Sequence, residues 1–231
     1  MERLVQPELL DALPPGDELA LRSRRDIRRL NALMGHPRLM ARTLEKNLRD
    51  NASLRIVELG AGDGLFLLSV AERMRARRLK VDATLVDRLD VLDPRMRGRF
   101  DALGWRIRAD IAEAIDWLRQ ASPDSSDVIM SNLFFHQFSA DELAEMFRLA
   151  ARSADTVIAL EPRRAWLQGF LGRFLWVAGC GSVTRYDGRV SIRAGFAGRE
   201  LSALWPDANN WELTERPAGL FTHLFLARRK G

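Results

Sequence analysis

The chain contains very little cysteine, lysine and tyrosine. Its 231 residues include one cysteine, Cys180, one tyrosine and three lysines, against 33 arginines. A single cysteine cannot form a disulfide within the chain, and neither it nor the scattered His36, His136 and His223 makes a recognisable metal-ligand spacing. We therefore expect no internal disulfide and no metal site, and we interpret Cys180 as a small buried hydrophobic residue.

The sequence also lacks a long apolar run without charge. Residues 165–183 come closest, but Arg173 interrupts this stretch and four glycines weaken it as a membrane span. The first residues, MERLVQPELLDALPPGDE, are acidic and contain prolines, unlike a secretory signal or a transit peptide. With 47% hydrophobic and 29% charged residues, the composition is typical of a globular domain, which we expect to be cytoplasmic.

The arginines give the chain a net charge of +5 and a pI near 10.2. Such a balance raises the question of a nucleic-acid partner. The basic runs are interrupted by acids, as at Asp26 within residues 22–29, and the excess of arginine over lysine fits an arginine-rich genome equally well. We therefore interpret these runs mainly as solvated faces and do not expect a nucleic-acid partner.

Hydrophobic periodicity divides the chain into three parts. Up to about residue 50 the pattern is helical: in SRRDIRRLNALMG we expect Ser23 to cap a helix that ends at Gly35, and Pro37 to open a second helix. Short apolar runs at 55–60, 82–87, 105–110, 127–133 and 155–162 then alternate with helical patterns at 64–77, 91–103, 111–120 and 139–152. The end of the chain carries two closely spaced strand patterns, NWELTER and FTHLFLARR.

This order of patterns predicts the fold class. Strands that alternate with helices indicate an α/β fold, in which helices cover both faces of a mostly parallel sheet. Two strands separated only by PAGL suit an antiparallel hairpin at the end of the chain. We expect a single domain over residues 1–231, with residues 1–50 as a helical N-terminal cap.

The motif VELGAGDG, residues 57–64, lies between the first strand and the following helix. At such a junction glycines let the backbone turn tightly and approach a ligand, and free N–H groups at the helix start favour polar or anionic groups. Gly60, Gly62 and Gly64 are spaced G-x-G-x-G, so that Leu65 occupies the last glycine position of a dinucleotide fingerprint, and no Walker loop follows. Two other interpretations of the motif stay open at this point: a turn that binds a different nucleotide, and a purely structural turn.

With Glu58 before it, this loop resembles the first motif of class I S-adenosylmethionine-dependent methyltransferases, and the resemblance extends over about residues 50–162. Asp87 ends the second strand, where an acid can accept both hydroxyls of a ribose. In the family, an acid at the end of the third strand, here Asp110, takes the adenine amino group, and the next side chain, here Ile111, packs on the ring. The resemblance implies a Rossmann-like seven-stranded sheet and S-adenosyl-L-methionine as the cofactor.

The fourth strand ends in SNLFFHQF, at the sheet edge where α/β folds bind ligands. Relatives that methylate exocyclic amines of nucleic-acid bases usually carry Asn-Pro-Pro-aromatic or Asp-Pro-Pro-aromatic here, whereas this chain has Asn132 followed by Leu133 and Phe134. We expect the Asn132 amide to contact the cofactor or the substrate.

His136, just beyond the fourth strand, is the candidate catalytic base. A phenol with a pKa of about 10 keeps its proton at neutral pH, whereas an imidazole near 6.5 is mostly free to accept it. His36 and His223 belong to the helical N-terminus and the terminal hairpin, away from this edge. Tyr186 and Glu161 stay open as alternatives, together with Asp187.

Residues 163–200 are expected to form a lid insertion, because family members commonly build a substrate lid between the fifth strand and the hairpin. The segment carries four aromatic residues at near-helical spacing and then a polar cluster: Trp166, Phe170, Phe174 and Trp176, then Arg185, Tyr186, Asp187, Arg189 and Arg193. The aromatic residues fit either a core or an apolar pocket for a flat small molecule.

A second, looser resemblance concerns the class of substrate. GSVTRYDGRVSIRAGFAGRELSALWP and LPPGDELALRSRRDIRRLNALMG resemble bacterial methyltransferases associated with type III polyketide synthases, although Tyr186 stands where many relatives have histidine. The resemblance implies O-methylation of an aromatic or polyketide-like small molecule. The alternatives are an RNA methyltransferase that uses the arginine-rich surface and a non-catalytic regulatory subunit that binds the cofactor.

Overall fold

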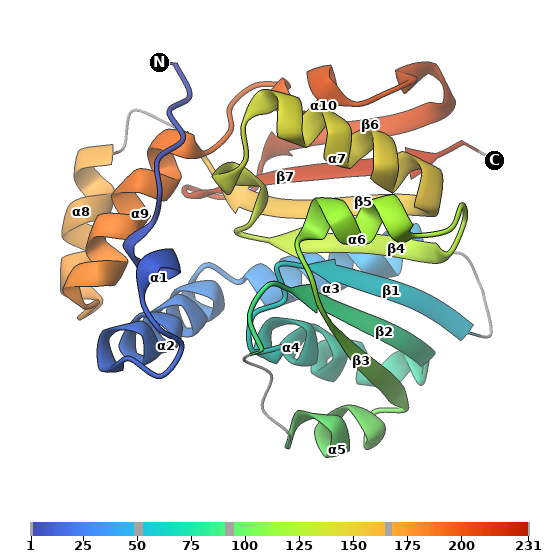
Figure 1. Ribbon diagram of the computed structural model, residues 1–231, viewed down its shortest axis with the longest axis horizontal. Helices are drawn as coiled ribbons and strands as arrows, with labels where there is room; N and C mark the ends of the chain where they lie inside the picture. Colours follow the sequence, from blue (N-terminus) through green and yellow to red (C-terminus); the bar gives the residue numbers. More distant parts are fainter. Residues whose placement is uncertain (1, 49–52, 91–94, 165–167, 231) are drawn as a thin grey trace.

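A seven-stranded sheet in the order β3-β2-β1-β4-β5-β7-β6 forms the centre of the molecule (Figure 1). The computed structural model describes residues 2–48, 53–90, 95–164 and 168–230. The strands are β1 Ser53–Leu59, β2 Lys80–Asp87, β3 Trp105–Ile111, β4 Ser126–Asn132, β5 Ala154–Pro162, β6 Trp211–Pro217 and β7 Thr222–Arg229. Neighbouring strands are parallel except that β7 is antiparallel to both β5 and β6. The predicted α/β fold, a mostly parallel sheet with a C-terminal antiparallel pair, is therefore confirmed.

Helices cover both faces of this sheet. The α-helices are α1 Leu9–Ala12, α2 Glu18–Leu33, α3 His36–Asn47, α4 Leu65–Met74, α5 Met96–Asp101, α6 Ala114–Gln120, α7 Ala140–Ser153, α8 Gln168–Val177, α9 Ser182–Ala194 and α10 Glu200–Leu204, with short 3-10 turns η1 Arg75–Arg77, η2 Phe135–Gln137 and η3 Ala208–Asn210. Helices α3, α4 and α5 pack on one face, and α6, α7 and α10 on the other. No helix in the described ranges is both long and apolar enough to cross a membrane.

The strands separate two hydrophobic cores because successive side chains point to opposite faces. In β1, Leu54 and Ile56 join the core under α3 and α4, whereas Val57 and Leu59 join the core under α6 and α7. Strands buried on both faces carry nearly continuous hydrophobic runs, which is why the central strands could be read from the sequence.

The start of α2 differs from the prediction. Asp17 caps this helix by accepting hydrogen bonds from the backbone N–H groups of Leu19 at 2.8 Å and Ala20 at 3.4 Å. Ser23 lies inside the helix, buried, and accepts a hydrogen bond from the hydroxyl of Thr184 in α9 at 3.1 Å. The prediction that Ser23 caps the helix is wrong because this side chain serves a contact between two helices distant in sequence. Gly35 ends α2 with a φ of +70°, as predicted.

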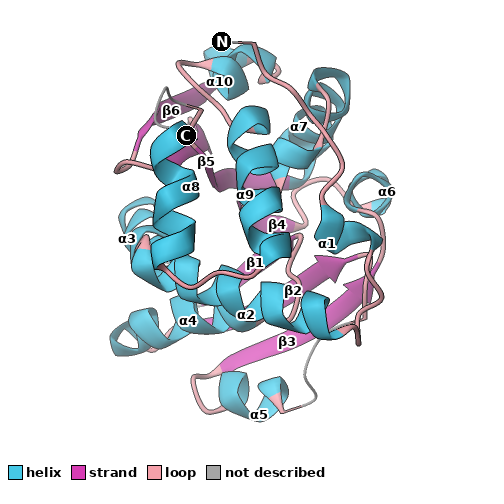
Figure 2. Ribbon diagram, turned by 90° about the vertical axis from the view of Figure 1, so that its left-hand side faces the viewer, coloured by secondary structure: helices cyan, strands magenta, loops and turns pink. Residues whose placement is uncertain are grey.

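The N-terminal helices and the helices after β5 meet at one end of the sheet. Figure 2 shows α8 and α9 beside α1 and α2, and the contacts between α9 and both N-terminal helices agree with this view. The chain therefore brings together segments from its first 35 residues and from residues 168–194, on the side where the parallel strands end.

Candidate active site

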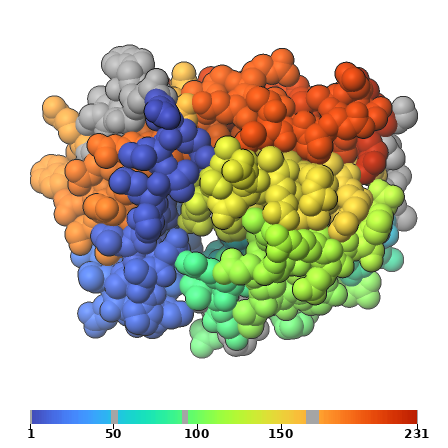
Figure 3. Space-filling model, turned by 45° about the horizontal axis from the view of Figure 1, so that its top comes forward, coloured from blue at the N-terminus to red at the C-terminus, as the bar shows by residue number. Residues whose placement is uncertain are grey.

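A cavity of about 630 Å³ opens where β1, β2 and β4 end. It is lined by the glycine turn after β1, the loop after β4, one face of α2 and one face of α9. Figure 3 shows a hollow in the surface between the N-terminal helices, in blue, and segments in green. Cavities of roughly 300–1,000 Å³ are usual for small-molecule sites.

The glycine turn has a backbone that other residues would not adopt without strain. Gly60, Gly62 and Gly64 have φ values of +69°, +54° and +74°. A Cβ on Gly60 would lie 2.3 Å from Cδ2 of Phe134, whereas a Cβ on Gly62 would meet nothing within 4 Å. The turn is therefore packed tightly against the loop after β4 at Gly60, while bare backbone faces open space at Gly62.

Glu58 is a buried acid beneath this turn, in the wall of the cavity. Glu58 is only 2% exposed, and its Oε2 has no hydrogen-bond partner among the described residues. Burial raises the pKa of this carboxyl well above its usual value, and the nearby Asp63 and Asp87 raise it further. A buried acid without a partner is costly, so it fits a ligand group that donates hydrogen bonds.

Asp87 lies at the end of β2 and also lines the cavity. Its Oδ2 accepts a hydrogen bond from the backbone N–H of Gly62 at 2.8 Å, and its Oδ1 accepts one from Leu89 at 2.9 Å. A carboxylate oxygen has a second lone pair, so both oxygens can still accept hydrogen bonds from a ligand. Asp87 therefore orders the glycine turn from the neighbouring strand.

The structure places Asp110 and Ile111 beside the cavity but not among the residues that line it. Asp110 accepts a hydrogen bond from the indole of Trp117 at 2.8 Å and pairs with Arg108 at 3.0 Å. Ile111 is 61% exposed. Beyond the end of β3, the cavity is lined by the next residues in the chain, 112–114. The adenine contacts expected of Asp110 and Ile111 stay a prediction.

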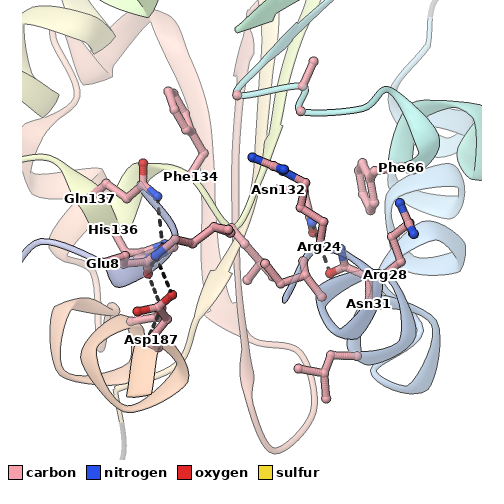
Figure 4. A pocket seen from close by; sticks show the side chains of 18 of the residues that line it. Glu8, Arg24, Arg28, Asn31, Phe66, Asn132, Phe134, His136, Gln137 and Asp187 are labelled. Atoms are coloured by element: carbon pink, nitrogen blue, oxygen red, sulfur yellow. Dashed lines mark hydrogen bonds and ion pairs between the residues drawn. The ribbon is translucent and has the colours of Figure 1, made fainter. Parts of the chain in front are cut away.

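His136, in η2, is held between two carboxylates, and Figure 4 shows one of them, Glu8, beside it. Its Nδ1 lies 2.9 Å from Oε2 of Glu161, and its Nε2 lies 3.1 Å from Oε1 of Glu8. Burial by itself lowers the pKa of the imidazole, but the two carboxylates outweigh it and raise the pKa to about 9. The imidazole is therefore protonated at neutral pH, and the expected free base near pKa 6.5 is not what this arrangement holds.

Glu161, at the end of β5, shapes the loop after β4. Its Oε1 accepts hydrogen bonds from the backbone N–H groups of Phe134 at 3.1 Å and Phe135 at 2.8 Å, and its Oε2 accepts one from His136 at 3.2 Å. The residue is fully buried. All these bonds converge on one carboxylate, so Glu161 positions the backbone and the imidazole of this loop together.

The N-terminal strap, which we define as residues 2–12, brings Glu8 to this cluster. Arg3 donates hydrogen bonds to the backbone carbonyls of Ala194 at 2.7 Å, His136 at 3.1 Å and Phe138 at 2.6 Å. Asp187 of α9 accepts hydrogen bonds from the backbone at the start of α1 at 2.7 and 3.1 Å. Glu8 is not among the residues predicted for the site, because no local pattern links it to a histidine 128 positions away.

The aromatic residues predicted around a pocket divide between cavity and surface. Phe174 lines the cavity and stacks on Phe221 with 5.3 Å between the ring centroids, whereas Trp176 is 69% exposed. Tyr186 is 44% exposed and is not among the lining residues. Trp166 and the side chain of Phe170 lie outside the described part of the structure.

The cluster around His136 makes the stability depend on pH. The pKa of an unfolded histidine is about 6.5, and the folded value is about 9, so the stabilisation is complete below the first value and lost as pH rises through the second. We expect the free energy of unfolding to fall by at most about 3 kcal/mol between about pH 6.5 and pH 9.5, measured by urea denaturation. Besides Glu8 and Glu161, the charged groups around the cluster include Arg3 and Asp11 of the strap and Asp187 of α9.

The matched measurement uses His136→Gln, which cannot titrate. This variant is expected to be less stable than the wild type at neutral pH and to lose most of the slope over the same pH range. An equal slope in both proteins would assign the pH dependence to another group.

Comparisons with solved structures place this site in a known fold. The fold matches a candidate O-methyltransferase from Nostoc punctiforme (TM-score 0.59, 14% identity), an O-methyltransferase family protein from Burkholderia thailandensis (0.57, 17%) and the S-adenosylmethionine-dependent methyltransferase SibL (0.59, 16%). The alignments cover 93%, 94% and 95% of this chain and 62%, 63% and 60% of those chains, so this chain spans about three-fifths of their length. No protein-family model and no curated protein matches the sequence.

The sheet order, the glycine turn and these likenesses define one class of fold. The chain has the Rossmann-like fold of class I S-adenosylmethionine-dependent methyltransferases. Within that class, the structures named above include O-methyltransferase family proteins.

Proposed function

We propose that the protein is an S-adenosylmethionine-dependent methyltransferase that O-methylates a hydroxyl of an aromatic, polyketide-like small molecule. The observation that supports this most directly is that one cavity joins the glycine turn to an apolar compartment with a few buried polar groups. Aromatic residues of the loop after β4 and of α8, among them Phe134, Phe138 and Phe174, line that compartment.

The cofactor half of the cavity fits the proposed ligand. Glu58 offers an unpartnered buried carboxyl for the amino group of the methionine part, Gly60, Gly62 and Gly64 give a turn whose bare backbone can approach it, and Asp87 offers carboxylate oxygens for the ribose. Asp110, Ile111 and the residues after them would lie towards the adenine. When bound, the cofactor supplies an activated methyl group, so the protein has only to align the acceptor, exclude water and take up a proton.

The cluster of Glu8, His136 and Glu161 is the proposed destination of that proton. Two carboxylates against one imidazolium give it a net charge of −1, and Glu8 and His136 both line the cavity. Uptake of the proton from the acceptor hydroxyl would make the cluster neutral. Residues 1–50 and 163–200 are proposed as the cap and the lid of this single domain, since α2, α8 and α9 contribute lining residues.

The test of the cofactor is thermal unfolding with and without ligand. A ligand that binds only the folded state at about 100 times its Kd stabilises it by about 2.7 kcal/mol, which for a domain of this size is a rise in Tm of about 5–10 °C. We expect this rise with S-adenosylmethionine and with its demethylated product, and none with NAD. A rise with NAD alone would overturn the proposal.

A pair of variants on β2 makes this test specific to the site. Asp87→Ala is expected to weaken cofactor affinity at least tenfold by calorimetry, because the glycine turn and the ligand both lose a charged acceptor. Asp82→Ala, on the same strand but exposed and paired with Arg106, is expected to bind as the wild type does. A methyl-transfer screen over phenols, pyrones and RNA then separates the proposed activity from RNA methylation and from binding without turnover.

A further inference from the structure

A chain of hydrogen bonds runs from β7 to the cavity through the buried His36, which the proposed reaction does not use. The Nε2 of His36 lies 2.7 Å from the hydroxyl of Thr222, and its Nδ1 lies 2.7 Å from Oδ1 of Asn132. The Nδ2 of Asn132 donates to Oδ1 of Asn31 at 3.2 Å. Four side chains from α2, α3, β4 and β7 are thus connected in one line.

The direction of the hydrogen bonds in this line follows from the charge of His36. Burial lowers the pKa of His36 to about 4, despite the hydrogen bond to Asn132, so the imidazole is neutral at pH 7 and carries one N–H. The carbonyl oxygen of the Asn132 amide can only accept, so that proton is on Nδ1, and the hydroxyl of Thr222 donates to Nε2. The NH₂ group of Asn132 is then the donor to Asn31.

Asn31 is the last member of the line and the one that ends at the cavity. It is 8% exposed, it lines the cavity from α2, and Figure 4 shows it near Asn132 and Arg28. Its Oδ1 is occupied by Asn132, whereas its Nδ2 donates no hydrogen bond to any residue that the structure describes. This donor group is open to the cavity within an otherwise buried side chain, so a ligand group that accepts a hydrogen bond can pair with it.

The charges around Asn31 favour a neutral acceptor group over a carboxylate. Arg28, the cation next along α2, is already paired with Asp63 at 2.5 Å. The cavity wall also carries Glu8, Asp11 and Asp187. A carboxylate on the substrate would enter a lining with eight acidic residues against four arginines, one of which, Arg24, lies near Asn31 on α2. A carbonyl oxygen needs only the amide donor and is not repelled by this excess of acids.

We propose that Asn31 is a specificity-determining residue that donates a hydrogen bond from Nδ2 to a carbonyl oxygen of the methyl acceptor. The acceptor is thus a hydroxy-carbonyl compound, an aromatic or pyrone-type ring that bears a ketone or lactone carbonyl as well as the hydroxyl that is methylated. This inference rests on the proposed methyltransferase function and adds the substrate's second recognition element to it.

The test compares two acceptors that differ only by the carbonyl oxygen, 7-hydroxychroman-4-one and 7-hydroxychroman. Binding of each is measured by calorimetry at pH 8 with the demethylated cofactor product present, so the result does not depend on turnover. We expect the wild type to bind the ketone at least tenfold more tightly, because loss of a hydrogen bond to a buried donor leaves that donor unpaired.

The decisive variant is Asn31→Asp, which keeps an oxygen for Asn132 and replaces the donor facing the cavity by an acceptor. We expect it to lose the preference for the ketone by at least tenfold, with affinity for the cofactor product within about twofold of the wild type. Asn31→Leu, which also lacks the N–H, is expected to lose the preference in the same way. Asn209→Asp, a change of the same chemistry at an exposed position in η3, is expected to keep it.

The outcomes separate the inference from the function on which it rests. Because each variant is compared with the wild type on the same two compounds, differences in the acidity of the phenols cancel. Tighter ketone binding that depends on Asn31, without methyl transfer, would uphold the inference and refute the proposed activity. An equal preference in the wild type and both Asn31 variants, or binding of neither compound while the cofactor product binds, would overturn the inference.

Discussion

Replacing Glu161 by alanine is expected to lower the free energy of unfolding by about 3–5 kcal/mol, a loss of Tm of about 6–20 °C. The reason is that the N–H groups of Phe134, Phe135 and His136, together with the imidazolium, would all lose their acceptor inside the protein. Glu8 still balances the charge of the imidazolium, so the loss comes from the buried donors that are left without an acceptor.

Urea denaturation measures this loss, and a second glutamate provides the control. Glu212 on β6 forms an exposed ion pair with Arg228, so Glu212→Ala is expected to change the free energy of unfolding by less than about 1 kcal/mol. If both variants lost the same amount, Glu161 would not be the residue that holds the loop after β4 in place.

Replacing His136 by glutamine is expected to reduce methyl transfer about 10²-fold, which is the usual size of a lost acid–base contribution. Glutamine can still donate one hydrogen bond, but it carries no positive charge between Glu8 and Glu161, so the carboxylates that would take up the proton lose the cation that holds them. Affinity for the demethylated cofactor product is expected to stay within about twofold, since His136 is not part of the glycine turn. Single-turnover rates and calorimetry separate the two quantities.

His223 offers a matched control for this prediction. It also pairs with a buried glutamate, Glu215, at 2.8 Å, but it is not among the residues lining the cavity. His223→Gln is therefore expected to lose stability while keeping the rate of the folded protein. A His136→Gln enzyme with a rate within about threefold of the wild type at pH 7 would leave His136 a structural residue.

The sequence predicted the sheet well because its signals are local. Strand bounds agree to within a few residues, as for β3 and β5, since continuous apolar runs bounded by turns report burial on both faces. The positions of Glu58, the three glycines and Asp87 at one sheet edge likewise follow from strand order, because parallel strands end at the same edge.

The acceptor side could not be predicted in the same way. Its polar groups come from distant segments: Glu8 lies before α1, Asn31 on α2 and Asp187 on α9, and Glu161 on β5 holds His136 from behind. No spacing along the chain brings them together. The same holds for the protonation of His136, because two acids far away in sequence raise its pKa. Ser23 failed as a helix cap for a related reason, since its partner Thr184 lies on another helix.

The N-terminal strap also has a practical consequence for anyone who handles the protein. Since Arg3 and the start of α1 are bonded to the loop after β4 and to α9, any affinity tag fused at the amino end is joined directly to a wall of the cavity. The carboxyl end, by contrast, lies beyond the far end of β7, on the opposite side of the molecule from the amino end (Figure 1). A tag at the carboxyl end is therefore the safer choice for activity screens, and ligand-dependent protection of the strap from proteases offers a label-free readout of binding in crude extracts.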